Sequence, residues 1–108
     1  MQMNSDAILF LGLMKRAGAL STGEADTGSA ARAGKAQLIL LAKDASDNAV
    51  KRAESFSRIG HCPLAVLEYT KEELGYSMGG NLCSMTAVTD RGFSDAFLKK
   101  YSTAFIMK

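Results

Sequence analysis

The segment Ser21-Thr22-Gly23 stands directly before a stretch rich in small residues, which we expect to form a helix. A helix N-terminus offers unpaired backbone N–H groups and a positive potential, and both attract phosphate. Polar side chains that could face a nucleic acid follow on the same stretch: Glu24, Asp26, Thr27 and Ser29, with Arg32 and Lys35 further along to meet phosphates. The alternative is a purely structural role, in which Thr22 caps the helix and the two basic residues are solvated.

A second candidate is the loop that begins at Met78. Its glycines allow unusual backbone shapes, and an apolar side chain there could stack beneath an unpaired base. A plain turn explains the loop equally well. Its residues are Gly79, Gly80, Asn81, Leu82 and Cys83.

Other site chemistries find little support. The segment GEADTGSA spaces two glycines like a phosphate-binding loop, but Ser29 stands where that motif needs lysine, and no GxGxxG follows a strand. The chain has one histidine, His61, and two cysteines, Cys62 and Cys83, outside any CxxC pattern. Asp44 and Asp47 fit turn or cap positions better than a ligand site. We therefore expect no metal site, no cofactor and no enzymatic activity.

Length, composition and net charge limit the possible domain number, ligands and location of the protein. The chain has 108 residues, of which 47% are hydrophobic, which predicts one domain spanning residues 1–108. Thirteen Lys plus Arg against eleven Asp plus Glu leave a net charge of +2, so any nucleic-acid site must be local and shaped. The apolar stretch from Ala7 to Met14 is too short to span a bilayer and lacks the basic flank of a signal peptide. We expect a cytoplasmic protein that does not enter membranes.

Helices and strands are expected to alternate. Helical spacing or boundary signals occur over residues 5–17, with Asn4 or Ser5 as cap, and over 24–33, 47–58, 70–78 and 93–101, with Arg91-Gly92 as a turn. Apolar runs at 37–42, 63–69 and 85–90 predict strands, and residues 19–21 a short extended piece. The pattern predicts a three-layer α/β/α sandwich with a small mixed sheet of about four strands, the run at 37–42 being central.

Four segments, in this order and spacing, resemble a known family. They are LGLMKRAGALSTGE from Leu11, RAGKAQLILLAKDASDN from Arg32, KEELG from Lys71 and TAVTDRGF from Thr86. Nearly the whole chain resembles the kink-turn RNA-binding superfamily of ribosomal proteins L-seven-Ae and L-thirty-e, especially its small bacterial YlxQ-like branch.

The resemblance implies a non-enzymatic protein that binds structured RNA, either a kink-turn or ribosomal RNA, and that can meet the ribosome or other RNA-associated proteins. The second helix would enter the kink-turn and read tandem sheared G·A pairs, while the loop before the last strand would hold an extruded base. The implied RNA-binding residues are Thr22, Gly23, Glu24, Asp26, Ser29, Arg32, Lys35, Gly79, Gly80, Asn81, Leu82 and Cys83.

Three positions of the second helix depart from the family pattern. The family's Asn-Glu pair falls on Ala25 and Asp26, and its lysine falls on Ser29. Asp26 preserves a shorter carboxylate acceptor, whereas Ala25 has no hydrogen-bonding side chain and Ser29 no charge. Each lost base contact typically costs about 1–3 kcal/mol, so weaker kink-turn binding is expected.

The competing hypothesis is a protein-interaction adaptor on the same fold that has lost kink-turn specificity. Such an adaptor would show an apolar surface patch. The candidates for this patch are Phe105, Ile106 and Met107 at the C-terminus, unless they pack back onto the core.

Overall fold

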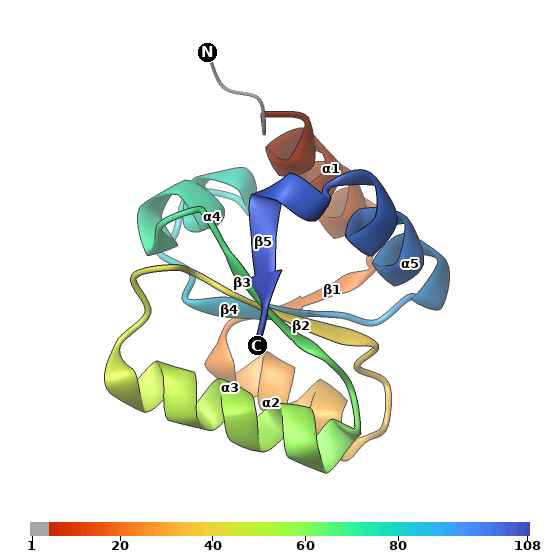
Figure 1. Cartoon of the computed structure of the whole chain (residues 1–108), viewed down its shortest axis with the longest axis vertical. Helices are drawn as coiled ribbons and strands as arrows, with labels where there is room; N and C mark the ends of the chain where they lie inside the picture. Colours follow the sequence, from red (N-terminus) through yellow and green to blue (C-terminus); the bar gives the residue numbers. More distant parts are fainter. Residues whose placement is uncertain (1–4) are drawn as a thin grey trace.

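The computed structural model describes residues 5–108, in which five α-helices alternate with the strands of one sheet (Figure 1). The expected cap Asn4 lies outside the described residues. In chain order the elements are α1 (Ser5–Arg16), β1 (Leu20–Thr22), α2 (Glu24–Arg32), β2 (Leu38–Leu41), α3 (Asp47–Gly60), β3 (Leu64–Leu67), α4 (Lys71–Ser77), β4 (Met85–Val88), α5 (Arg91–Lys100), a 3₁₀ turn (Ser102–Ala104) and β5 (Phe105–Met107).

The sheet is mixed, as expected, and its strand order is β1-β4-β2-β3-β5. β2 is the central strand and runs parallel to β3, whereas the other neighbouring strands are antiparallel. The sheet has five strands rather than about four, because the C-terminal residues Phe105–Met107 pair with β3 along its outer edge. Three residues after a 3₁₀ turn carry too short a pattern to predict a strand.

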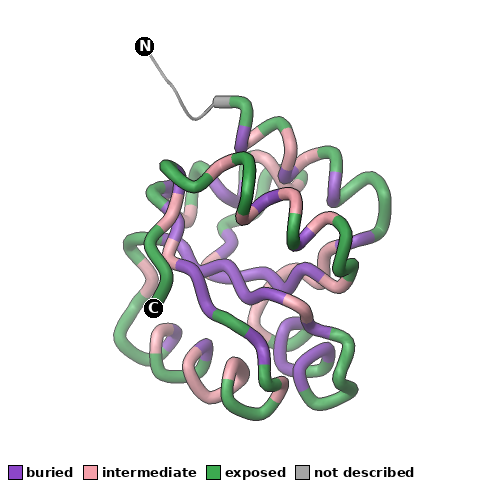
Figure 2. Tube along the Cα trace, turned by 45° about the vertical axis from the view of Figure 1, so that its right-hand side comes forward, coloured by how far each residue is buried: buried purple, intermediate pink, exposed green. Residues whose placement is uncertain are grey.

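The sheet lies between two helical layers, with α2 and α3 on one face and α1, α4 and α5 on the other (Figure 1). All four residues of β2 are buried, and the centre of the sheet is the most enclosed part of the molecule (Figure 2). Leu38 and Leu40 belong to the core beneath α1, α4 and α5, whereas Ile39 and Leu41 belong to the core beneath α2 and α3. The two faces alternate because successive strand residues point to opposite sides.

Local capping signals begin three of the helices. The Ser46 hydroxyl accepts a hydrogen bond from the Ala49 N–H at 3.1 Å and begins α3, while Thr70 and Glu73 form the expected capping box of α4. The prediction of a turn at Arg91-Gly92 was wrong. Asp90 accepts from the Phe93 N–H at 2.8 Å and caps α5, so both residues lie in its first turn.

Candidate functional site

The start of α2 is held against β4 by backbone contacts. Gly23 is the N-cap residue, with φ 94° and ψ 168°, a conformation that glycine adopts without strain. Its N–H donates to the Met85 carbonyl at 2.9 Å, and its own carbonyl accepts from the Thr27 N–H at 2.9 Å. Thr22 belongs to β1 and makes no cap bond, so the prediction that it caps α2 was wrong. The turn at Gly23 sets the direction in which α2 leaves β1.

Two buried threonine hydroxyls stabilise the turn from β1 into α2. The Ser21 carbonyl accepts from Thr86 Oγ1 at 3.0 Å and from Thr27 Oγ1 at 3.3 Å. One carbonyl thereby connects β1, the second turn of α2 and β4. The first turn of α2 is consequently fixed in direction before any ligand arrives, which lowers the entropic cost of binding.

The loop between α4 and β4, residues 78–84, folds back over α4. Gly75 carries no side chain at the crossing, where a β-carbon would overlap the Asn81 carbonyl oxygen and lie 2.9 Å from the Leu82 Cα. The Gly75 carbonyl accepts from the Gly80 N–H at 2.8 Å. Gly79 and Gly80 have φ values of 118° and 109°, so this turn favours glycine at both positions.

This loop meets the start of α2 at Cys83. The thiol is buried and donates to the Met85 carbonyl at 3.1 Å, the same carbonyl that accepts from the Gly23 N–H. Burial raises the pKa of Cys83, and hydrogen bonding with the Gly23 backbone acts in the opposite direction. The neighbouring Leu82 side chain is 72% exposed. Segments about 60 residues apart in the chain thus form one continuous surface.

The polar residues of α2 divide between two sides of the helix. A shallow groove of about 310 Å³ runs between β1 and α2, and its polar lining comes from Ser21, Asp26, Ser29 and Lys35. Arg32 is not part of this groove. Its Nη1 lies 3.2 Å from the position a β-carbon would take on Gly28, on the side of α2 that packs against Phe56 of α3.

Glu24 also turns toward α3. Its carboxylate lies 3.4 Å from Arg52 Nε in a largely exposed ion pair. Exposed pairs of this kind contribute about 0–1 kcal/mol and exchange readily with other partners. The Glu24 carboxylate can therefore leave Arg52 and accept a hydrogen bond from a ligand at the start of α2.

Comparison with known proteins shows the family of this chain. The model of the ribosomal protein L7Ae/L30e/S12e/Gadd45 family matches residues 10–98. This chain belongs to that family. A curated relative, "RNA-binding protein YlxQ" from Bacillus subtilis (strain 168), is 33% identical over 88 residues, which cover 82% of this chain and 87% of the relative.

A solved structure described as a protein of unknown function from Bacillus halodurans C is also similar. It has a TM-score of 0.76 and 28% sequence identity, covering 84% of this chain and 91% of the other. The L7Ae/L30e/S12e/Gadd45 family membership and the α/β/α sandwich predicted from the sequence are therefore confirmed.

In this L7Ae/L30e/S12e/Gadd45 family member, the N-terminus of α2 and the loop at 78–84 meet at the Met85 carbonyl. Of the two basic residues expected to meet phosphates, Lys35 lines the groove, whereas Arg32 lies on the side of α2 that packs against α3. Lys15, in the last turn of α1, lies beside the site although the sequence did not indicate it, because its Nζ donates to Thr22 Oγ1 at 3.3 Å. No local pattern indicates this proximity, since it depends on the turn between α1 and β1.

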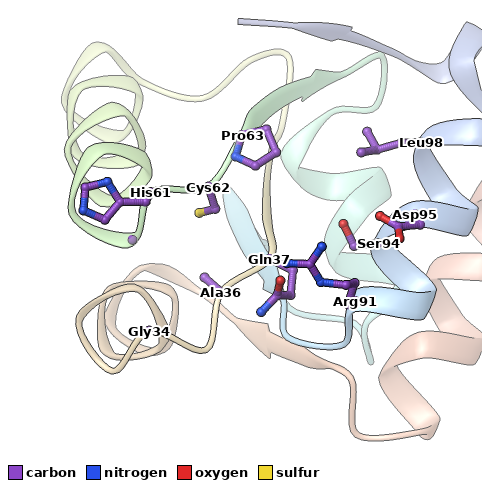
Figure 3. Close-up of a pocket in the computed structure, with 11 residues that line it drawn as sticks. Gly34, Ala36, Gln37, His61, Cys62, Pro63, Arg91, Ser94, Asp95 and Leu98 are labelled. Atoms are coloured by element: carbon purple, nitrogen blue, oxygen red, sulfur yellow. The ribbon is translucent and has the colours of Figure 1, made fainter.

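A larger cleft, of about 390 Å³, lies at the opposite end of the sheet (Figure 3). Its walls come from the α2–β2 and α3–β3 connections and from one face of α5, including Gln37, Cys62, Arg91 and Ser94. The cleft contains none of the predicted site residues. No group of three or more His, Cys, Asp or Glu side chains that could hold a metal ion occurs within residues 5–108. Over the same residues, no helix has the length and apolar character to cross a membrane.

Proposed function

We propose that this chain is a non-enzymatic RNA-binding protein that acts as one domain over residues 1–108 and recognises structured RNA. The observation that carries the proposal is the junction of the α2 N-terminus with the loop at 78–84 through Met85, in a member of this ribosomal protein family. The similarity to a relative named as an RNA-binding protein supports it.

The mechanism depends on shape more than on charge. Backbone N–H groups in the first turn of α2 bind phosphate or base-edge acceptors, and Glu24 and Asp26 accept from base N–H groups. The exposed Leu82 side chain provides an apolar surface for an unpaired base, while the flanking glycines let the RNA backbone approach closely. A net charge of +2 suits an RNA recognised by its distorted geometry.

The RNA that fits this surface best is a kink-turn or a similar ribosomal RNA element, and the partners are that RNA and ribosome-associated proteins. Ala25 and Ser29 present no strong hydrogen-bonding group or charge where the family pattern has asparagine and lysine. Two missing contacts at about 1–3 kcal/mol each predict an affinity at least tens of times below that of a family member that retains both.

The test is a titration of a labelled kink-turn stem against a straight duplex of the same composition. Wild-type protein should prefer the kink-turn, and A25N/S29K should bind it at least tenfold more tightly because it restores both contacts. Ser102→Lys, an exposed substitution distant in sequence from the site, controls for added charge. Micromolar protein that shifts neither RNA at low salt would refute RNA binding, and equal affinity for both RNAs would refute kink-turn specificity.

The adaptor alternative has a smaller surface than the sequence indicated. Phe105 stacks on Phe97 at 5.6 Å between ring centroids and packs against the core, which leaves Ile106 and Met107 exposed on β5. Ile106 is 76% exposed at the edge of the sheet. Retention of a protein partner after nuclease treatment, and its loss in Ile106→Lys, would favour the adaptor over the RNA-binding role.

A further inference from the structure

Lys15 lies close to the N-terminus of α2 because the chain reverses sharply after α1. Gly18, with φ 74°, and the bond from the Ala19 N–H to the Met14 carbonyl at 2.9 Å turn the chain into β1. β1 then carries Thr22 back past the last turn of α1, where its hydroxyl accepts from Lys15 Nζ at 3.3 Å. The ammonium group of Lys15 therefore lies beside Thr22, the residue directly before the N-cap residue Gly23.

The positive charge of Lys15 is not neutralised by a carboxylate. Within residues 5–108, ion pairs join Arg52 to Glu24 and Lys108 to Glu54, and Lys15 belongs to neither. Among the described residues, its hydrogen-bond partner is the neutral Thr22 hydroxyl, and an ammonium group has three donors. The side chain is exposed, so two donors and the full charge are available to a ligand.

The surrounding surface needs this charge in order to hold a polyanion. The first six residues of α2 contain two carboxylates, Glu24 and Asp26, and no Lys or Arg. Arg52 is already paired with Glu24, and Lys35 lies beyond the C-terminal end of α2. The two carboxylates offset the positive potential of the helix N-terminus, so a further cation beside it would favour the approach of phosphate.

Lys15 also acts electrostatically on the loop at 78–84. Its positive charge acts on the Cys83 thiol and lowers the pKa of that group against the larger effect of burial. An ammonium group that contacts Thr22 and acts on Cys83 lies at the junction of the α2 start and the loop.

We propose that Lys15 is a phosphate-binding residue of the RNA interface and supplies, from α1, the cation that the start of α2 lacks. This inference rests on the proposed RNA-binding function. The ammonium group binds the RNA backbone where it passes from the start of α2 to the loop at 78–84. It sets affinity and register and does not select a base, because a phosphate contact carries no sequence information.

The experiment titrates a kink-turn stem with tandem G·A pairs against wild-type protein, Lys15→Met, Lys15→Arg and Arg58→Met at several salt concentrations. Arg58 is the matched control because it is an exposed basic residue in the last turn of α3, which ends beside the N-terminal end of β3, away from the Gly23 turn. Both substitutions to Met remove one charge from a helix C-terminus, so they should change stability by similar small amounts.

Lys15→Met should weaken binding about fivefold at 0.1 M salt and reduce the slope of log affinity against log salt by about 0.7–0.9. Lys15→Arg should retain the slope, and Arg58→Met should match wild type. If wild type binds but Lys15→Met keeps its affinity and slope, the role of Lys15 is refuted while RNA binding stands. Equal losses in Lys15→Met and Arg58→Met would show a general charge effect and also refute it. Absence of wild-type binding would refute both proposals.

Discussion

Gly75 shows how one residue positions the candidate interface. It is buried in α4, and the chain between Asn81 and Leu82 crosses the space that a side chain would occupy. The sequence places this glycine inside a short helix, where glycine usually weakens the structure by about 0.5–1 kcal/mol relative to alanine. Its presence there is explained only by the loop that packs on it.

Replacing Gly75 with alanine should displace the loop. The new β-carbon would overlap the Asn81 carbonyl, so we expect a loss of about 1–3 kcal/mol in the free energy of unfolding and weaker RNA binding. Gly12→Ala in α1 is the control, because its β-carbon would meet no atom closer than 3.6 Å and should stabilise the helix. Urea unfolding and RNA titration of both variants measure the effect. A Gly75→Ala protein that is as stable as wild type and binds RNA equally well would contradict it.

At the scale of elements, the close packing of α2 against α3 fixes the direction in which α2 projects. A β-carbon on Gly28 would lie 2.8 Å from Phe56 Cζ, and one on Gly60 would lie 3.3 Å from the Ala31 Cα. The small residues noted in the sequence therefore serve the helix–helix contact on one side of α2. They leave the opposite side, with Asp26 and Ser29, facing the groove.

Gly28→Ala should consequently destabilise the protein by about 1–3 kcal/mol through overpacking against Phe56. Phe56→Leu removes ring atoms and leaves a cavity by itself, but the double variant should recover part of the loss because alanine fills the vacated space. A double-mutant cycle measured by urea unfolding gives the coupling. Additive losses in the double variant would show that these two positions do not compete for the same space.

The free energy of unfolding of the whole protein depends on pH because both cysteine thiols are buried. Burial raises the pKa of Cys83 above its ordinary value of 9.0, so the folded state holds the proton more tightly than the unfolded chain. This contribution to stability is complete below pH 9 and is lost as the pH rises through the folded value. Burial, with the nearby Glu68 and Glu73 carboxylates, also raises the pKa of Tyr69 to about 12, so the window from pH 8 to pH 10 isolates the thiols best.

The free energy of unfolding should therefore fall between pH 8 and pH 10, with part of the fall due to Cys83. Cys83→Ser keeps a hydroxyl that can donate to the Met85 carbonyl but does not titrate in this range, so its fall should be smaller. Urea unfolding at half-unit pH steps measures both slopes. A slope in Cys83→Ser as steep as in wild type would assign the effect to other groups.

The amino-acid sequence predicts the helices, the inner strands and the class of fold from local signals. Those features depend on signals within a few residues, such as the Thr70–Glu73 capping box, the Ser46 cap and the apolar run of β2, so they are visible without tertiary information. It also determined that charge is low overall, which restricts RNA recognition to a shaped local site.

Which residues share the candidate interface depends on tertiary contacts. The contacts of Lys15 with Thr22, of Gly23 with Met85 and of Gly75 with Asn81 depend on chain reversals and on sheet pairing. Arg32 and Lys35 also lie on different surfaces, because Arg32 is on the side of α2 that packs on α3 and Lys35 lines the groove. Local patterns carry no information about contacts between distant segments, because those contacts are selected by the packing of the whole core.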